Sequence, residues 1–376
     1  MILEMDQGTG GPPRERAVAP GNRPARSRVL AGEARGEEST VRHRVERVEG
    51  ASRRKLGAAI FFLSVLALPL PAADVARTVE VGPGERLSVA DEGAGEPVLL
   101  LPSLTFPAFG FRRVVPLLVK AGRRVIVVEP LGQGGSSQPE AADYSLGAQA
   151  DRVGRALDAL QVGPVVVVAQ AAGASTALRL AYRRPDRVRA VLSLEGGVSE
   201  EVLTPGARRA IRFAPLLKLF GGERLIRGRV RKTLVERSRD PGWVTPEVVD
   251  AYLRSAGADF DAILRTYRLM ARATEAEPLR ARLKDVRCPV RLLFGGSPHP
   301  SGVPEDELAA MRAGLARLEL ETVPGSGHFV AEEAPDAVAR AVETLLLETA
   351  TATAVPAESL CCTRTPRLVR IAHGCP

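Results

Sequence analysis

The apolar positions between Val75 and Glu348 follow two alternating patterns. Short runs rich in Val, Leu and Ile, typical of strands buried on both faces, are separated by longer segments with helical spacing. This alternation predicts an α/β fold with a mostly parallel, twisted sheet and helices on both faces. The eight expected strands are Arg77–Val81, Arg86–Ala90, Val98–Leu101, Arg124–Val128, Val165–Val168, Ala190–Leu194, Val290–Phe294 and Leu318–Val323. The expected helices are Phe111–Ala121, Leu146–Leu160, Ala172–Arg183, Glu305–Ala316 and Pro335–Leu347.

The alternation stops between Ser199 and Lys284, where only helical patterning remains. We expect residues 199–284 to form a helical cap inserted after the sixth strand, so that residues 74–198 and 285–348 build the core. Four aromatic residues of this segment are candidates either to line a ligand pocket or to pack inside the cap: Trp243, Tyr252, Phe260 and Tyr267.

The N-terminal segment has a different composition. Residues 1–52 are rich in Arg, Glu, Gly and Pro and have no apolar period, which is typical of a disordered chain or of an extension beyond the true start. Basic residues followed by the apolar run Leu56–Leu70 and by small residues predict a signal peptide at 53–73 and export to the periplasm or the exterior. The alternative is an uncleaved segment, residues 56–73, that anchors the protein to a membrane.

The positive charge lies mainly at the two ends of the 376-residue chain. Of the net charge of +8, residues 1–55 contribute 12 Arg or Lys against 8 Asp or Glu, and residues 349–376 contribute three Arg against one Glu. Only 4% of the residues are aromatic. We therefore expect no nucleic-acid partner, and membrane contact only through the signal segment.

The four cysteines do not form a metal-binding pattern. Three of them, Cys361, Cys362 and Cys375, lie in an expected irregular tail at 349–376, and none pairs with another as C-x-x-C. Gly132 and Gly134 follow a strand but lack the third glycine of a dinucleotide fingerprint, and no Walker loop is present. We expect neither a metal nor a cofactor; the alternative is a metal site in the tail, where His373 lies two residues from Cys375.

Four segments carry a resemblance to a known family. Val125–Ser136 is a strand followed by a glycine-rich turn. Val165–Val188 is a strand, a tight turn of small residues and a helix that ends in Pro-Asp-Arg-Val. Val290–His299 is a strand followed by a loop. Pro324–Phe329 places a histidine after the last strand. Over about residues 77–348, this order resembles the α/β-hydrolase superfamily, in the branch with a helical cap after the sixth strand.

The resemblance implies a set of site residues, two of which are substituted. His328 matches the catalytic histidine, whereas Ala171 stands at the position of the nucleophile. Pro298 occupies the usual position of the acid, for which Glu195 at the end of the sixth strand is an alternative. The backbone amides of Leu104 and Ala172 match the oxyanion-binding positions, although Pro102-Ser103-Leu104 replaces the family's usual His-Gly.

Alanine has no lone pair with which to attack a substrate, and loss of a serine nucleophile alone costs on the order of 10⁶ in rate. We expect a protein without ordinary serine-hydrolase activity that binds a small apolar molecule or a partner under its cap. One alternative is a cofactor-free enzyme in which His328, oriented by Glu195, acts as a general base. The other is a hydrolase with an atypical nucleophile, Ser175 or Ser103.

Overall fold

The computed structural model describes a core and a cap, and all structural statements below concern its described residues: 76–103, 106–203, 208–209, 211, 222–255, 260–299 and 302–353. The predicted N-terminal extension and signal peptide lie outside these residues, as do the three cysteines of the predicted tail. No helix within the described ranges is long and apolar enough to cross a membrane.

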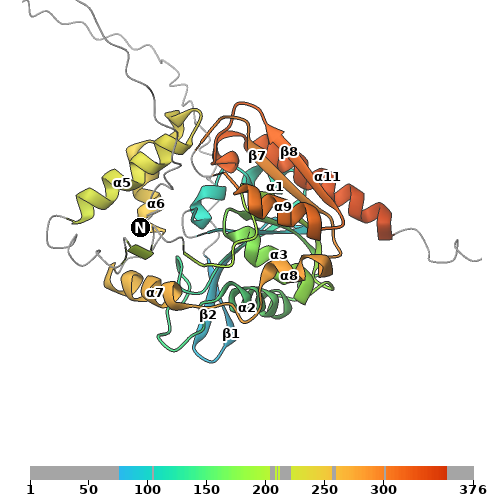
Figure 1. Ribbon diagram of the computed structural model, residues 1–376, viewed down its shortest axis with the longest axis horizontal. Helices are drawn as coiled ribbons and strands as arrows, with labels where there is room; N and C mark the ends of the chain where they lie inside the picture. The colour runs from blue at the N-terminus through green and yellow to red at the C-terminus, as the bar shows by residue number, and fades with distance from the viewer. Residues whose placement is uncertain are drawn as a thin grey trace, which may run out of the picture. The chain divides into compact units, whose positions relative to one another are not determined.

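A single eight-stranded sheet forms the centre of the core, with the strand order β1-β2-β4-β3-β5-β6-β7-β8 (Figure 1). β2 pairs with both of its neighbours in antiparallel fashion, and all other neighbouring strands are parallel. The predicted sheet is therefore confirmed, and each strand lies within two residues of its predicted bounds. The strands are β1 (Arg77–Gly82), β2 (Glu85–Glu92), β3 (Glu96–Leu101), β4 (Arg123–Glu129), β5 (Val165–Gln170), β6 (Val188–Leu194), β7 (Val290–Gly295) and β8 (Leu318–Val323).

Both faces of the sheet are covered by helices. Every residue of β5 is buried, and successive residues point to opposite faces. Val165 and Val167 pack in one apolar cluster with α2 and α3, whereas Val166 and Val168 pack in a second cluster with α1 and α11. The continuous apolar runs of the sequence thus reflect strands with two buried faces. The helices of the core are α1 (Val115–Lys120), α2 (Leu146–Ala159), α3 (Gly173–Arg183), α9 (Glu305–Gly314), α10 (Val330–Glu333) and α11 (Pro335–Thr353).

Two predicted helices differ from their predicted bounds by more than two residues. The predicted helix Phe111–Ala121 is divided into a 3-10 turn, η1 (Ala108–Phe111), and α1. Pro116 explains the division, because proline is compatible with the first turn of a helix but not with its interior. Helix α11 runs to Thr353, five residues into the predicted irregular tail, because no glycine or proline interrupts it there.

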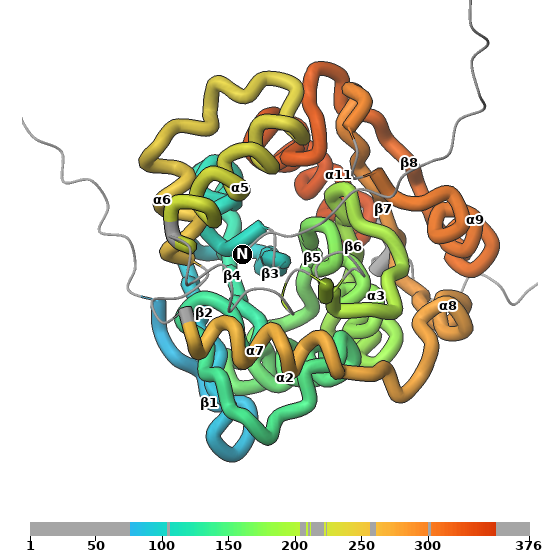
Figure 2. Tube along the Cα trace, turned by 60° about the vertical axis from the view of Figure 1, so that its left-hand side comes forward, coloured from blue at the N-terminus to red at the C-terminus, as the bar shows by residue number. Residues whose placement is uncertain are grey.

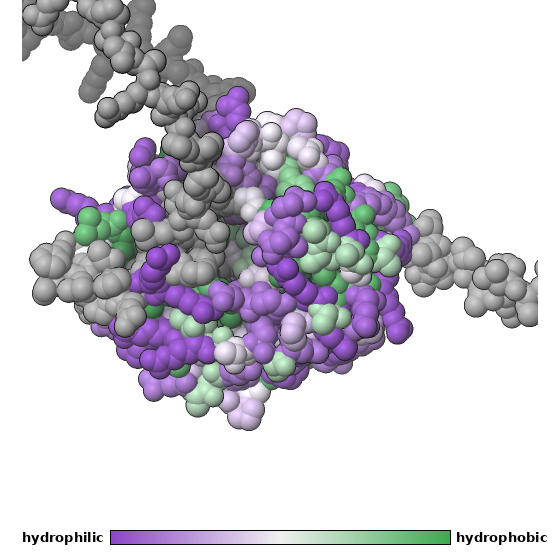
Figure 3. All heavy atoms as spheres, viewed as in Figure 1, coloured by the Kyte–Doolittle hydropathy of each residue, from purple (hydrophilic) through white to green (hydrophobic). Residues whose placement is uncertain are grey.

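Only helices are described between the end of β6 and the start of β7, consistent with a cap (Figure 2). They are α5 (Gly222–Arg237), η2 (Pro241–Trp243), α6 (Pro246–Arg254), α7 (Phe260–Arg272), α8 (Leu279–Arg282) and η3 (Leu283–Asp285). The face shown in Figure 3 is largely hydrophilic, with apolar residues dispersed among polar ones.

Both ends of the cap are attached to one buried cation. The side chain of Arg179 in α3 is fully buried, and its guanidinium contacts Glu200 (2.9 Å) before the cap helices and Glu275 (3.2 Å) after α7. Glu200 also accepts hydrogen bonds from the backbone N–H groups of Leu279 and Arg280. These charge-assisted bonds fix the positions at which the chain leaves the core and returns to it.

Candidate functional site

The turn between β5 and α3 has the strained backbone of a nucleophile elbow. Ala171 stands at its tip with φ = +46°, in the left-handed region that a residue with a side chain rarely adopts. The Ala171 N–H donates to the carbonyl of Leu194 (2.9 Å), and the Ala171 carbonyl accepts from the N–H of Ala174 (2.9 Å). Ala171 therefore lies in the turn to which the resemblance assigned it, with a methyl group as its side chain; that this is the nucleophile position stays a prediction.

Glycines on two sides leave room for this turn. A methyl group added at Gly173 would lie 3.0 Å from the carbonyl oxygens of Leu101 and Pro102. One added at Gly196, directly after Glu195, would lie 2.2 Å from the carbonyl oxygen of Ala171. The elbow thus retains the small residues that its close packing requires.

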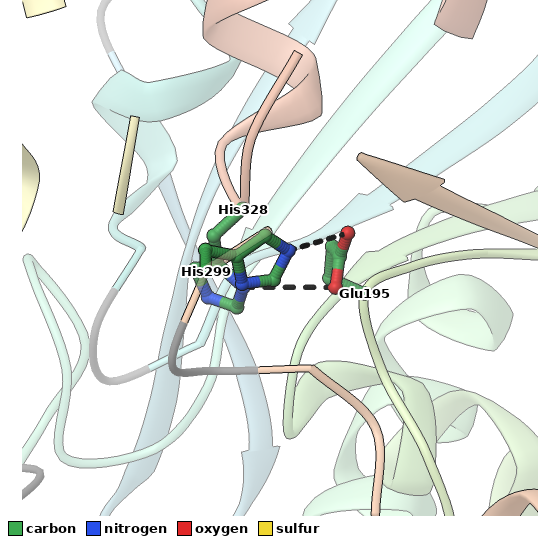
Figure 4. Close-up of side chains that lie close together, drawn as sticks. All are labelled: Glu195, His299 and His328. Atoms are coloured by element: carbon green, nitrogen blue, oxygen red, sulfur yellow. Dashed lines mark hydrogen bonds and ion pairs between the residues drawn. The ribbon is translucent and has the colours of Figure 1, made fainter. Parts of the chain in front are cut away.

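Glu195 follows β6, and its carboxylate faces the rings of His299 and His328 (Figure 4). Its backbone is also left-handed, with φ = +57°, and its side chain is fully buried. The Gly295 N–H donates to Oε1, and Nε2 of His299 lies 3.2 Å from the same oxygen. Nδ1 of His328 lies 3.9 Å from Oε2. Both imidazole rings therefore face the same carboxylate from one side.

The environment of Glu195 favours its charged form. Burial acts to raise its pKa, but His299, His328 and the N–H of Gly295 act in the opposite direction and leave the pKa of Glu195 below its usual value. Glu195 is accordingly ionised at neutral pH, as required of a group that orients a histidine or binds a cation.

His328 is held by both the core and the cap. It follows β8, and its side chain is 4% exposed. The backbone N–H of His328 donates to the carbonyl of Arg237 in α5 (2.9 Å). The backbone carbonyl of His328 accepts from Nε2 of Gln170, the last residue of β5 (3.2 Å). The backbone of His328 is therefore fixed on two sides.

The position that resembles the family's usual acid carries a proline, which has no ionisable side chain. Pro298 is exposed in the loop after β7, whereas the side chain of its neighbour His299 is only 7% exposed and faces Glu195. The sequence analysis did not identify His299 as a site residue. One signal was available, because the chain contains only four histidines and this one adjoins the substituted acid position.

Comparisons with known proteins identify the family. The sequence profile of the alpha/beta hydrolase family matches residues 98–341. The chain belongs to this family. It is 33% identical over 176 residues to 2-hydroxymuconate semialdehyde hydrolase of Pseudomonas sp. (strain CF600), covering 43% of this chain and 61% of that protein. It is 36% identical over 113 residues to an epoxide hydrolase of Caballeronia sordidicola, covering 30% and 34% respectively.

The fold comparison reaches further along the chain. The solved structure of the epoxide hydrolase CorEH superimposes with a TM-score of 0.60 at 20% identity, covering 73% of this chain and 98% of that one. At this identity the likeness concerns the fold alone. The chain spans less than two thirds of the length of both curated relatives named above.

The contacts of Ser175 and Ser103, the two alternative nucleophiles of this α/β-hydrolase, are those of structural residues. Ser175 is fully buried, and its hydroxyl donates to the carbonyl of Gly197 (3.0 Å) and accepts from the N–H of Ser199 (2.8 Å). Ser103 is buried, and its backbone forms a two-way bridge with Phe106. Neither serine lies at the elbow.

The predicted oxyanion donors are only partly described. Leu104 lies outside the described residues. Ala172 immediately precedes α3. The N–H groups at the start of a helix have no partner within that helix. The role of both amides stays a prediction.

Aromatic side chains from cap and core meet beside His328. Phe329 lies 5.1 Å from the His328 ring and 5.5 Å from Trp243 of η2, between ring centroids. Trp243 is half-buried, whereas Tyr252 and Tyr267 are buried and belong to the packed interior. The side chain of Phe260 lies outside the described residues. The site thus combines an apolar wall, a buried carboxylate and two imidazoles with a methyl group at the elbow.

Proposed function

We propose that this α/β-hydrolase-fold protein does not form an acyl-enzyme and instead binds a small apolar molecule under its cap. The observation that carries the proposal is Ala171, whose methyl group stands at the tip of an intact elbow. Acyl transfer through a side chain needs an attacking atom there, and alanine has none.

Two observations support a small apolar ligand. Trp243 and Phe329 bring aromatic surface from cap and core to the side of His328, and Trp243 is only half-buried. The curated relatives are named for hydrolysis of 2-hydroxymuconate semialdehyde and of epoxides, which are small organic molecules. Binding sites for such molecules are typically lined by aromatic and aliphatic side chains with a few polar groups.

Tryptophan fluorescence tests the binding proposal, because Trp243 is the chain's only tryptophan. The probe is 4-nitrophenyl butyl ether, an apolar, non-hydrolysable molecule whose nitrophenyl ring quenches tryptophan. We expect saturable quenching that Phe329→Ala weakens. The matched control is Leu347→Ala, which removes an exposed apolar side chain from α11. Quenching that rises linearly without saturation, or that is equal in all three proteins, would contradict the proposal.

Restoring the nucleophile tests the chemical part. Intact-protein mass spectrometry after incubation with p-nitrophenyl acetate should show no acetylated wild-type protein. Ala171→Ser should raise the rate of ester hydrolysis by two or more orders of magnitude, because the elbow and the Glu195–His328 pair are already in place. Acetylation of the wild type at Ser103, Ser175 or His328, located by peptide mapping to separate it from uncatalysed acetylation of amines and thiols, would refute the proposal.

A second candidate function is general-base catalysis by His328 on a bound water or an acidic substrate proton. The approach of Nδ1 to Oε2 of Glu195 favours it, since 3.9 Å is a separation that can tighten when a substrate binds. Turnover of short-chain p-nitrophenyl esters by the wild type that disappears in His328→Ala would support this function. Equal rates for the two proteins would exclude His328-dependent ester hydrolysis.

A further inference from the structure

Glu195, His299 and His328 come from three different strand ends and converge on one point. One ligand-type atom of each lies within 4.8 Å of the corresponding atoms of the other two. Nε2 of His299 lies 3.2 Å from Oε1 of Glu195, and Nδ1 of His328 lies 3.9 Å from Oε2. In a tetrahedral zinc site with bonds of about 2.0–2.1 Å, neighbouring ligand atoms lie about 3.3 Å apart.

We propose that Glu195, His299 and His328 form a binding site for a divalent transition-metal ion. The proposal goes beyond ligand binding under the cap and does not depend on it. The donor set is two imidazoles and one carboxylate, which suits Zn²⁺ and, as a facial triad, Fe²⁺. It does not suit Mg²⁺ or Ca²⁺, which prefer an all-oxygen environment. Three protein ligands leave a fourth position for water, as in the open class of zinc sites.

Burial and unsatisfied atoms give a second, independent reason. The exposed fractions of the three side chains are 0% for Glu195, 7% for His299 and 4% for His328. Within the described part of the chain, neither Oε2 of Glu195 nor Nδ1 of His328 has a hydrogen-bond partner. Buried polar atoms are nearly always satisfied, and an ion between these two atoms satisfies both.

The surrounding contacts orient the carboxylate. The N–H of Gly295 donates to Oε1 of Glu195, so that Oε2 remains directed at His328. Hydrogen bonds that orient a ligand in this way are a regular part of metal sites. The rings of His299 and His328 are tilted by 58° with centroids 5.4 Å apart, so they are not stacked face to face. Each ring presents one nitrogen to the carboxylate, Nε2 of His299 to Oε1 and Nδ1 of His328 to Oε2.

The metal site and the general-base function require different states of one atom. As a base oriented by Glu195, His328 carries a proton on Nδ1 and accepts a proton on its other ring nitrogen. As a metal ligand, it must present Nδ1 without a proton. One experiment therefore separates the two.

The test measures zinc binding to the full-length, untagged protein. After treatment with EDTA and desalting, zinc sulfate is added, and the bound metal is quantified by mass spectrometry and by competition with a chromophoric chelator. We expect about one zinc ion per chain. His299→Ala, His328→Ala and Glu195→Gln should each weaken zinc affinity by at least about 100-fold, since each removes one of three ligands.

Zinc binding at the tail cysteines and His373 must be distinguished from binding at the proposed site, because thiolates also bind zinc. The variant that combines Cys361→Ser, Cys362→Ser and Cys375→Ser should retain the ion. Co²⁺ bound to the wild type should show no thiolate charge-transfer absorption. Circular dichroism and urea unfolding in EDTA establish that each variant is folded before it is titrated. If zinc follows the cysteines, or if wild type and His299→Ala bind equally, the proposal is wrong.

Discussion

The turns that follow β5 and β6 lie at neighbouring strand ends, and each begins with a residue at positive φ, Ala171 at +46° and Glu195 at +57°. The first turn has the backbone shape predicted for the family's elbow and carries only a methyl group at its tip. The second retains a reactive carboxylate although the usual acid position, Pro298, has changed. Shape and reactivity are therefore separable: the backbone of the elbow needs small neighbours, whereas chemistry needs one particular side chain.

The largest expected effect breaks the packing that joins the two turns. Gly196→Ala places a methyl group 2.2 Å from the Ala171 carbonyl oxygen and 2.5 Å from Cβ of Ala174. We expect a loss of about 3 kcal/mol in the free energy of unfolding, measured in urea. Gly163→Ala, where the added methyl group meets nothing within 4 Å, is the control and should change stability by less than about 0.5 kcal/mol. Equal stability of the two variants would show that the turns are not coupled in this way.

Ser175→Ala removes the polar link between α3 and the segment after β6. The hydroxyl serves both the Gly197 carbonyl and the Ser199 N–H, and both groups lose this partner in a buried position. We expect destabilisation by about 2 kcal/mol in the same assay. Any ester hydrolysis, including that of Ala171→Ser, should keep its rate per folded molecule. A selective loss of rate with unchanged stability would restore Ser175 as a nucleophile.

Ala171→Gly tests whether the elbow is strained. Glycine adopts positive φ at little cost, so we expect this variant to be more stable than the wild type by about 0.5–1 kcal/mol. The matched variant Ala174→Gly, inside α3, should be less stable by about 1 kcal/mol or more. Destabilisation of the same size in both variants would mean that Ala171 pays no conformational cost.

The smallest effect concerns a second strand-end carboxylate. Glu129 ends β4, and its pKa is raised by burial, against which the hydrogen bonds of Gly135 and Ser88 act only in part. A raised pKa means that the stability contributed by the protonated form is complete below the unfolded pKa of about 4.5 and is lost as pH rises through the folded pKa. Glu129→Gln should therefore match the wild type near pH 4 and exceed it by less than about 1 kcal/mol at pH 8. Urea unfolding at both pH values measures this difference. The opposite trend, in which Glu129→Gln becomes less stable than the wild type as the pH rises, would mean that the pKa of Glu129 is lowered like that of Glu195.

The sheet and most core helices were predictable because their residues are buried on a regular period. The resemblance assigned Ala171 and His328 to their turns, since both follow strands at fixed distances. His299 was not predictable in this way, because its approach to Glu195 depends on how two loops fold and on no local period. The expectation of no metal came from the spacing of the cysteines, which gives no information about Glu195, His299 and His328, residues that lie up to 133 positions apart along the chain.

The buried guanidinium of Arg179 has a consequence for protein engineering. Because it contacts Glu200 and Glu275, the two ends of the cap are held at fixed points whatever lies between them. Closing a loop whose ends are already fixed costs little extra as the loop lengthens. A foreign helical insert joined at Glu200 and Glu275 would therefore inherit a ready-made attachment to the core, which makes the cap an exchangeable module on an unchanged sheet.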